Sequence, residues 1–214
     1  MKYIALLSSG LDSTVNIYWA HKKATVTLAL TLDYGQRSAV KEISNAKKIC
    51  DELKIPHKTI TVDFFKDFTK TSLINTQEAV PKHMQIDDLS ECQETAKAVW
   101  VPNRNGIFIN IAAGFAEGLG VDQILVGFNK EEGATFLDNT QAYLDRVNES
   151  LEYSTRNKVK VTSFTTAMNK TDIVREGRKL NVNFDFIWSC YFANDTACGE
   201  CESCLRLQRA LKDA

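Results

Sequence analysis

Short apolar runs alternate with helical segments along most of this chain, and that alternation limits the folds open to it. Residues 3–7 form an apolar run suited to a strand buried on both faces, and residues 25–33 alternate β-branched and aliphatic side chains. Residues 12–23 and 38–53 are predicted helices. The same reasoning predicts strands at 59–62, 123–128 and 158–162 and helices at 104–119, 139–153, 171–180 (with Thr171 as N-cap) and 201–211. Strands that alternate with helices imply right-handed crossovers and a parallel sheet covered on both faces, so the expected fold class is α/β.

One stretch interrupts this pattern. Residues 73–102 contain Pro81 and Pro102, mixed charges and no clean amphipathic periodicity. An irregular segment of this length inside a compact domain is usually a lid, a binding loop or a mobile insert. We therefore expect one α/β domain over residues 1–185 that carries this insert, followed by a C-terminal segment over residues 186–214.

Composition and charge are those of an ordinary globular protein. Hydrophobic residues make up 44% of the chain and charged residues 25%, and 26 basic against 27 acidic side chains leave a net charge of −1. This balance gives no electrostatic reason to expect nucleic acid or an anionic membrane as a partner. The apolar run at 3–7 ends too early for a signal peptide, and no stretch is long enough to span a membrane. We expect a cytoplasmic protein, whose six cysteines are thiols or metal ligands rather than disulfides.

The loop after the first predicted strand has the features of an anion site. It reads SSGLDST over residues 8–14 and leads into the first predicted helix, whose N-terminus presents unpaired N–H groups. Gly10 lets the backbone approach phosphates, and Asp12 would repel them unless it held a Mg²⁺ ion between. For the turn alone, an ordinary strand–turn–helix with a Ser or Asp cap is the better interpretation. The loop is neither a Walker A motif nor a GxGxxG fingerprint.

Four cysteines near the C-terminus have the spacing of a metal site. Cys190, Cys198, Cys201 and Cys204 form a C-x7-C-x2-C-x2-C pattern, which can close a tetrahedral site of four thiolates. Structural zinc is the favoured interpretation, an iron–sulfur cluster is the alternative, and incidental buried thiols come last. Cys50 falls on the apolar face of a predicted helix and is assigned to the core.

These motifs carry a resemblance to known enzymes. The loop resembles the Ser-Gly-Gly-x-Asp-Ser loop of the N-type ATP pyrophosphatases, which split ATP into AMP and pyrophosphate while adenylating a substrate. Ser9 stands where that family usually has its first glycine, so a serine must adopt the backbone angles that the loop demands. Over most of its length, the chain resembles the 7-cyano-7-deazaguanine synthase (QueC) family of queuosine and archaeosine biosynthesis. The segments that carry the resemblance are SSGLDS (8–13), DYGQR (33–37), VPNRN (101–105), VGFN (126–129), KTDIV (170–174) and WSC (188–190) with the later cysteines.

The resemblance implies a fold, a reaction and cofactors. The fold is a Rossmann-like domain of the adenine nucleotide alpha hydrolase type with a C-terminal zinc-binding helical extension. The reaction converts 7-carboxy-7-deazaguanine and ammonia into the nitrile 7-cyano-7-deazaguanine with ATP, through an adenylated carboxylate and then an amide. ATP, Mg²⁺ and Zn²⁺ are the implied cofactors, and a homodimer is the implied assembly.

The resemblance also implies which residues form the site. Asp12, Ser13, Lys170 and Arg104 would carry the chemistry, with Lys170 and Arg104 offsetting charge on the phosphates. Without the motifs, a lone Lys would be interpreted as a solvated charge at a helix end. The nucleotide would contact Leu7, Ser8, Ser9, Gly10, Leu11, Asp12, Ser13, Thr14, Asp33, Tyr34, Gly35 and Gly127. The substrate would contact Gln36, Arg37, Asn105, Asn129 and Asp138, although Gln36 and Arg37 could instead cap the next helix.

The chain departs from the common family pattern after Asn129. Many members have an Asp-Tyr-Ser-Gly-Tyr-Pro-Asp-Cys-Arg-like stretch that recognises the deazaguanine, whereas residues 130–139 read KEEGATFLDN. Asp138 would keep the place of the base-binding acid, because a carboxylate accepts hydrogen bonds from a guanine-type N–H and amine. Two alternatives stay open: a ligase that transfers the adenylated acid to another amine, such as a protein terminus, and a non-catalytic nucleotide-binding scaffold.

Overall fold

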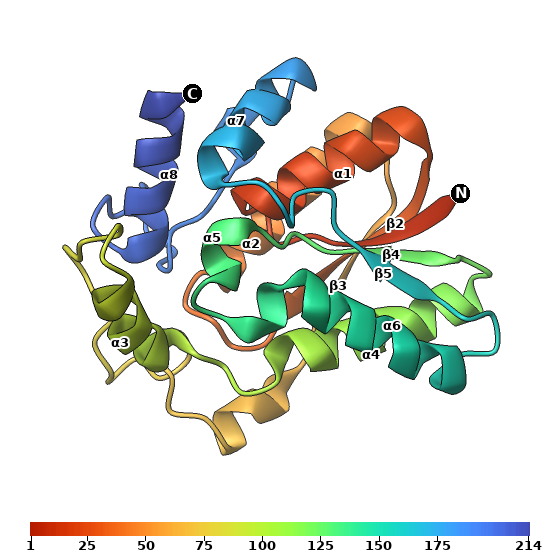
Figure 1. Cartoon of the computed structure of the whole chain (residues 1–214), viewed down its shortest axis with the longest axis horizontal. Helices are drawn as coiled ribbons and strands as arrows, with labels where there is room; N and C mark the ends of the chain where they lie inside the picture. Colours follow the sequence, from red (N-terminus) through yellow and green to blue (C-terminus); the bar gives the residue numbers. More distant parts are fainter.

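A five-stranded sheet forms the centre of the molecule. The computed structural model describes all residues from 1 to 214. The strand order is β3-β2-β1-β4-β5, and every neighbouring pair is parallel (Figure 1). The strands are β1 (Lys2–Leu6), β2 (Thr25–Asp33), β3 (His57–Thr61), β4 (Gln123–Leu125) and β5 (Lys160–Thr162). In register, Ile4 of β1 lies between Leu28 of β2 and Ile124 of β4. The strand order reverses between β1 and β4, and open parallel sheets bind ligands at such a point, beyond the carboxyl ends of the strands.

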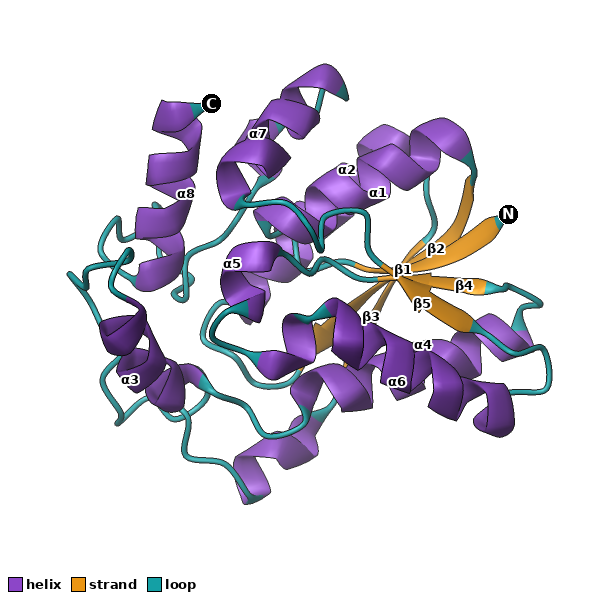
Figure 2. Cartoon of the chain, in the orientation of Figure 1, coloured by secondary structure: helices purple, strands orange, loops and turns teal.

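Helices cover both faces of the sheet (Figure 2). One face carries α1 (Leu11–Lys23), α2 (Ala39–Leu53) and α7 (Lys170–Lys179), and the other carries α4 (Arg104–Gly118) and α6 (Gln141–Ser154). The core therefore has two halves. Ile4 packs in one half with Ile109 of α4, whereas the next residue, Ala5, packs in the other half with Val15 of α1. None of the helices is long and apolar enough to cross a membrane.

The fold class predicted from the sequence is confirmed, and most predicted elements lie close to their observed bounds. The predicted strand 25–33 is observed in full. The predicted strand 123–128 is shorter, because it ends at Leu125 and the next residues turn into a cavity described below. Thr171 as N-cap of α7 is wrong, since the Asn169 side chain caps this helix and accepts a hydrogen bond from the Asp172 amide at 2.8 Å. The division of the chain at residue 185 stays a prediction.

The insert at 73–102 contains a helix that the sequence pattern did not predict. This helix, α3 (Leu89–Val99), is capped by Asp88, whose side chain accepts hydrogen bonds from the amides of Ser90 and Glu91. The residues that it buries are Cys92, Ala96 and Val99. Because two of these three side chains are small, the buried face carries too weak an apolar signal for a periodicity argument.

The insert is tied to the body of the molecule rather than projecting from it. The Arg37 guanidinium donates hydrogen bonds to the backbone carbonyls of Ser72 at 2.7 Å, Asn75 at 2.7 Å and Glu78 at 2.6 Å. Further along, Lys82 pairs with Cys201 in an isolated antiparallel bridge. Figure 1 shows α3 lying near the final helix, α8 (Glu202–Asp213), although the two are far apart in the sequence.

Candidate active site

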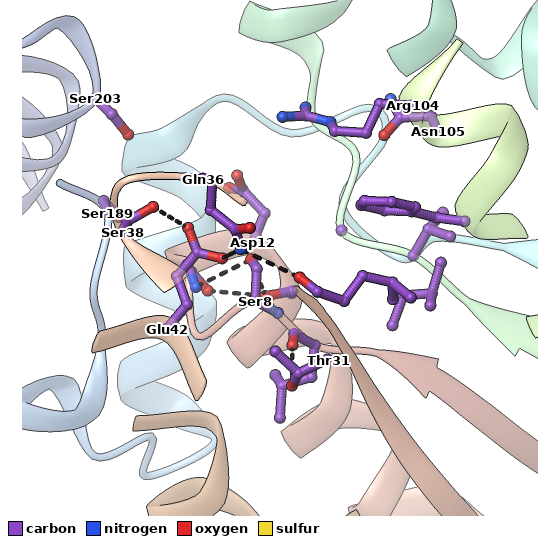
Figure 3. Close-up of a pocket in the computed structure, with 18 of the residues that line it drawn as sticks. Ser8, Asp12, Thr31, Gln36, Ser38, Glu42, Arg104, Asn105, Ser189 and Ser203 are labelled. Atoms are coloured by element: carbon purple, nitrogen blue, oxygen red, sulfur yellow. Dashed lines mark hydrogen bonds between the residues drawn. The ribbon is translucent and has the colours of Figure 1, made fainter. Parts of the chain in front are cut away.

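A cavity of about 240 Å³ lies beyond the carboxyl ends of the central strands (Figure 3). It is lined by the loop after β1, the end of β2, the start of α4 and the segment 188–191, which includes the first of the four clustered cysteines. A smaller cavity of about 130 Å³ shares Arg104, Glu132 and Tyr191 with it. The predicted phosphate loop and the predicted polar start of α4 therefore meet at one site.

Most of the predicted phosphate loop faces the cavity. Leu7, Ser8, Gly10, Leu11, Asp12 and Ser13 line it. Gly10 is the N-cap of α1, so the unpaired amides of the first helical turn lie at this wall. The hydroxyl groups of Ser8 and Ser13 are 3.2 Å apart. The loop thus presents hydroxyl and amide donors, together with the Asp12 carboxylate, at the start of one helix.

Ser9 and Thr14 do not line this cavity, although the sequence assigned both to the nucleotide. Both side chains are fully buried, and neither hydroxyl oxygen has a hydrogen-bond partner. Ser9 has a φ of 59°, a left-handed conformation that glycine adopts at far lower cost. Ser9 therefore adopts the backbone angles of a glycine, as its place in the loop predicted.

Gly127 allows the end of β4 to approach the phosphate loop. A Cβ atom at this position would lie 2.4 Å from the Ser13 backbone nitrogen and 2.7 Å from its Cα. No side chain fits there, because these are main-chain atoms that cannot rotate away. Gly127 also lines the cavity, as expected of a residue predicted to contact the nucleotide.

A buried charge cluster joins the loop to α7. The Lys170 ammonium lies 2.9 Å from Asp12 Oδ2 and 2.8 Å from Glu132 Oε1. Burial alone would lower the pKa of Lys170, but the two carboxylates outweigh it and raise that pKa. Asn129 donates to Asp12 Oδ2 at 3.1 Å. Lys170 is therefore charged and fixed at the cavity wall, next to the loop.

The same cluster leaves one acceptor free. Asp12 Oδ1 is buried and has no hydrogen-bond partner. Burial raises the pKa of Asp12 against the attraction of Lys170. An unpaired carboxylate oxygen in a cavity beside hydroxyl groups is a suitable ligand for a hard cation such as Mg²⁺. The residues present therefore fit the cation that the sequence analysis assigned to Asp12.

The end of β2 contributes Tyr34 and Gln36 to the cavity, but Asp33, Gly35 and Arg37 do not line it. The Gln36 side chain accepts from the Tyr34 amide and donates to the Leu32 carbonyl and to Glu42. Its amide thus holds the turn that follows β2. The Arg37 side chain binds the insert, as described above, and makes no contact with this cavity.

Arg104 stands where the two cavities meet. Its guanidinium donates one hydrogen bond, to the Tyr34 hydroxyl at 3.1 Å, and keeps its other donors free. Burial would lower the pKa of Arg104, but the neighbouring Tyr34, Asp138 and Glu42 raise it, so the group is charged. Among the predicted residues, Arg104 has the most donors available for an anionic ligand.

The three remaining predicted substrate residues are Asn105, Asn129 and Asp138, and they lie in different places. Asn105 lines the larger cavity and donates to Asp138 Oδ2 at 2.9 Å, and Asp138 lines the smaller one. Burial raises the pKa of Asp138. Asn129 lines neither cavity, because its amide is used to hold Asp12 and to cap a short helix, α5 (Lys130–Gly133).

Several cavity residues were not found by sequence reasoning. They are Thr31, Ser38, Glu42, Glu132, Asn139, Trp188, Ser189, Tyr191 and Ser203. Glu132 and Glu42 lie on helices where a carboxylate is ordinarily solvated, so no local pattern marks them. Trp188 had a weak signal, as part of the WSC segment, and its backbone amide donates to the Ser9 carbonyl at 2.9 Å.

The four C-terminal cysteines converge. None of the six cysteines forms a disulfide, and the sulfur atoms of Cys190, Cys198, Cys201 and Cys204 all lie within 4.8 Å of one another. A tetrahedral zinc site with Zn–S bonds of about 2.3 Å places its sulfurs about 3.8 Å apart, so a small contraction would close the site. Backbone amides of Phe192 and Cys198 point at the Cys190 sulfur, at 3.4 and 3.3 Å, as suits a thiolate. The donor set fits a structural metal ion.

Comparison with known proteins places this chain in a family. The family model for "Queuosine biosynthesis protein QueC" matches residues 2–214. A protein of Bdellovibrio bacteriovorus named 7-cyano-7-deazaguanine synthase is 51% identical, over 100% of this chain and 94% of that protein. Proteins of the same name from Carboxydothermus hydrogenoformans and Methanosarcina mazei are 48% and 42% identical, over 98% and 100% of this chain and 97% and 94% of theirs.

Solved structures with much lower identity share the fold. The U34-tRNA thiolase NcsA from Methanococcus maripaludis superposes with a TM-score of 0.53 at 16% identity, over 99% of this chain and 72% of that one. A 4-thiouridine synthetase in complex with RNA and ATP gives a TM-score of 0.51 at 20% identity, over 99% of this chain and 50% of that one. These two structures support the Rossmann-like architecture. The family model and the full-length relatives show that this chain belongs to the QueC family.

Proposed function

We propose that this protein uses ATP to convert 7-carboxy-7-deazaguanine and ammonia into 7-cyano-7-deazaguanine, through an adenylated carboxylate and then an amide. The observation that carries the proposal is the Asp12–Lys170–Glu132 cluster at the phosphate loop, in a chain whose full-length relatives bear the name of this synthase. No feature of the site and none of these names favours transfer to a protein amine or a scaffold without catalysis.

The phosphate loop would bind the ATP phosphates. The amides at the start of α1 and the Ser8 and Ser13 hydroxyl groups supply the donors, and a structure with this fold is known with bound ATP. A Mg²⁺ ion held by Asp12 would neutralise charge on the phosphate oxygens. Lys170 lies on the same wall, and its fixed ammonium would stabilise the charge that develops as pyrophosphate leaves.

Adenylation makes the substrate carboxylate reactive. A carboxylate oxygen attacks the α-phosphorus, the bond to the bridging oxygen breaks, and pyrophosphate departs. Arg104 has free donors where the two cavities meet, so it would orient the carboxylate toward the nucleotide. Attack of ammonia on the resulting mixed anhydride gives the amide and AMP, and a second ATP-driven activation removes the amide oxygen to leave the nitrile.

The smaller cavity would hold the deazaguanine ring. Asp138 supplies an acceptor for a ring N–H and an exocyclic amine. The rings of Trp100 and Phe136 line the same cavity, stacked with centroids 6.0 Å apart at an interplanar angle of 11°. A planar bicyclic base would fit this cavity, because its ring could stack on the aromatic side chains while its N–H groups donate to Asp138.

Two further proposals concern the cysteine cluster and the assembly of the protein. The four clustered cysteines would bind one zinc ion and make residues 186–214 a distinct metal-binding segment. The homodimer implied by the family resemblance is also a proposal, which size-exclusion chromatography with light scattering would test.

Acid-dependent exchange of pyrophosphate into ATP tests the adenylation step. Lys170→Met should reduce this exchange by about 100-fold or more, because it removes a fixed charge at the phosphates. Lys179→Met is the matched control on the same helix, since the Lys179 side chain is 72% exposed and pairs only with Glu176, and it should exchange like the wild type. Wild-type exchange that did not depend on the deazaguanine acid would contradict the proposal.

A further inference from the structure

Glu42 of α2 is a cavity residue that the reaction described above leaves without a role. Its carboxylate lines the larger cavity, where Oε1 accepts from the Ser38 hydroxyl at 2.6 Å and Oε2 from the Gln36 amide at 2.9 Å. Figure 3 shows it beside Ser38 and Ser189, on the other side of the view from Arg104 and Asn105. A carboxylate has about four acceptor positions, so two contacts leave room for a ligand.

Glu42 differs from the other acids of the two cavities in its partners. Asp12 and Glu132 are paired with Lys170, and Glu202 is paired with Arg206. The remaining acid, Asp138, lines only the smaller cavity, where the proposed function assigns it to the base, and it accepts from Asn105 and Asn139. Within the larger cavity, Glu42 is therefore the carboxylate that forms no direct ion pair with a lysine or arginine.

The surroundings of Glu42 make its carboxylate easier to protonate than an exposed one. Burial raises the pKa of Glu42, and the hydrogen bonds from Ser38 and Gln36 and the positive charge of Arg104 reduce that rise. Asp33 at the end of β2 adds a further rise. The phenol of Tyr34 also faces this group, and its pKa is raised, mainly by burial, so it stays neutral. An acid with such neighbours is suited both to attract a cation and to accept a proton.

The proposed reaction needs a group of this kind. Ammonia attacks as the free amine, whereas the ammonium ion predominates in water near neutral pH. An ammonium ion that enters a partly dry cavity requires an anion beside it, and it must lose a proton before its nitrogen has a lone pair to donate.

We propose that Glu42 is the ammonium site of this enzyme and the base that releases ammonia from it. One N–H bond of the ammonium ion breaks and an O–H bond forms on the Glu42 carboxylate. The nitrogen lone pair then forms a C–N bond to the adenylated carboxyl carbon, and AMP leaves with the electrons of the C–O bond. The attacking nitrogen and Glu42 each give one proton to water, so that the amide is neutral and Glu42 is again a carboxylate.

This inference rests on the proposed function, and its test compares two nucleophiles. Hydroxylamine is uncharged near neutral pH, so it needs no base to become nucleophilic and would trap the adenylated acid as a hydroxamate. Glu42→Gln keeps the size of the side chain and removes the base. It should lose about 100-fold or more of its turnover with ammonium and still form hydroxamate at the wild-type rate. Acid-dependent pyrophosphate exchange should be retained, because adenylation precedes the step assigned to Glu42.

Two variants complete the design. Asp51→Asn is the matched control on α2, since the Asp51 side chain is 65% exposed and pairs with Lys47, and it should use both nucleophiles like the wild type. Glu42→Asp keeps a carboxylate on a side chain that is shorter by one methylene group. It should raise the KM for ammonium and leave the KM for hydroxylamine unchanged. This second variant also supplies the test if Glu42→Gln does not fold.

Each outcome bears on the inference. Wild-type use of ammonium by Glu42→Gln, or a parallel loss with ammonium and hydroxylamine, would show that Glu42 is a structural residue and would overturn the assignment. Loss of exchange in the variant alone would overturn it as well, because Glu42 would then act in adenylation. Absence of acid-dependent exchange in the wild type would instead overturn the proposed function, and the ammonium site with it.

Discussion

At Gly127 and Ser13, two stretches of main chain lie so close together that only a glycine, which has no Cβ, fits at position 127. The loop and the end of β4 are separated by more than 100 residues of sequence, yet a Cβ at Gly127 would overlap the Ser13 amide. The amides at the start of α1 can face the cavity only if no side chain at position 127 displaces this end of the helix. This contact therefore links backbone packing to the nucleotide binding proposed for the loop.

Gly127→Ala should disable the site, and Gly114→Ala is its matched control. The added methyl group must displace the start of α1, so we expect a loss of stability of about 2 kcal/mol or more and a loss of acid-dependent pyrophosphate exchange. Gly114 lies on the exposed side of α4, where a Cβ meets nothing within 4 Å, so the same substitution there should keep the exchange activity and raise the stability by up to about 1 kcal/mol. Urea denaturation and the exchange assay measure the two effects. Equal behaviour of the two variants would contradict this account of Gly127.

Ser9→Gly should stabilise the protein. The substitution removes a left-handed serine and a buried hydroxyl group without a partner, so the free energy of unfolding should rise by about 1 kcal/mol. Ser8→Gly is the control. Ser8 faces the cavity and accepts a hydrogen bond from the Gly10 amide, so no gain is expected there. A lower unfolding midpoint for Ser9→Gly would mean that Ser9 makes contacts that its buried hydroxyl does not indicate.

Single residues also show where sequence reasoning succeeds and where it stops. The loop residues could be proposed from the sequence because they follow one another along the chain and their pattern has a direct physical meaning. Asn129 and Arg37 were assigned to the substrate, but the structure uses Asn129 to hold Asp12 and Arg37 to hold the insert. Their partners lie far away in the sequence, so no local pattern could distinguish a ligand contact from a structural one.

Among elements, the contact between α8 and α5 ties the cysteine segment to the charge cluster. Arg206 of α8 is buried and lies 3.1 Å from Glu131 and 2.9 Å from Glu202. Glu131 also accepts a hydrogen bond from the Lys170 amide at 2.8 Å. Glu132, the next residue, binds the Lys170 ammonium. A displacement of α8 would therefore be transmitted to the lysine proposed to bind phosphates.

Arg206→Met should destabilise the protein strongly, because it leaves the buried Glu202 carboxylate without its partner and removes one of the two arginines that pair with Glu131. We expect a loss of about 3 kcal/mol, and a double-mutant cycle with Glu131→Gln should give a coupling energy above about 1 kcal/mol. Arg146→Met removes an exposed ion pair with Glu149 and serves as the control, with an expected change within about 0.5 kcal/mol. Strict additivity of the two buried substitutions would contradict a direct role for the Arg206–Glu131 pair.

The elements themselves were largely predictable, because strands and helices of this fold carry strong local periodicity. The strand 25–33 and the helix that begins at Arg104 have continuous apolar faces, and both were predicted closely. Helix α3 was missed because its buried face uses Cys92 and Ala96, and α5 was missed because it is one short turn. The packing of the insert on the cysteine segment, through the pairing of Lys82 with Cys201, depends on distant contacts that no local pattern contains.

In the whole molecule, the cysteine cluster lies where the C-terminal segment, the insert and the cavity meet. Val80 of the insert packs among the cysteines, and Cys190 lines the cavity. A metal ion at this point would therefore stabilise the cavity wall as well as the C-terminal segment.

Metal removal tests this arrangement. The purified protein should contain about one zinc ion per chain, and chelation should lower its melting temperature and accelerate amide hydrogen exchange around residues 80–83 and 186–204. Cys204→Ser should lose the metal, whereas Cys50→Ala, on the buried face of α2, should retain it. Iron with acid-labile sulfide in place of zinc would favour the iron–sulfur alternative and contradict the zinc assignment.

The most direct test of the proposed function is the mass of the product. The protein would be incubated with ATP, Mg²⁺, 7-carboxy-7-deazaguanine and ¹⁵N-labelled ammonium, and the products resolved by mass spectrometry. The account predicts 7-cyano-7-deazaguanine with one ¹⁵N atom in its nitrile, together with AMP and pyrophosphate. A labelled amide that accumulates without nitrile, or AMP without any labelled deazaguanine, would contradict it.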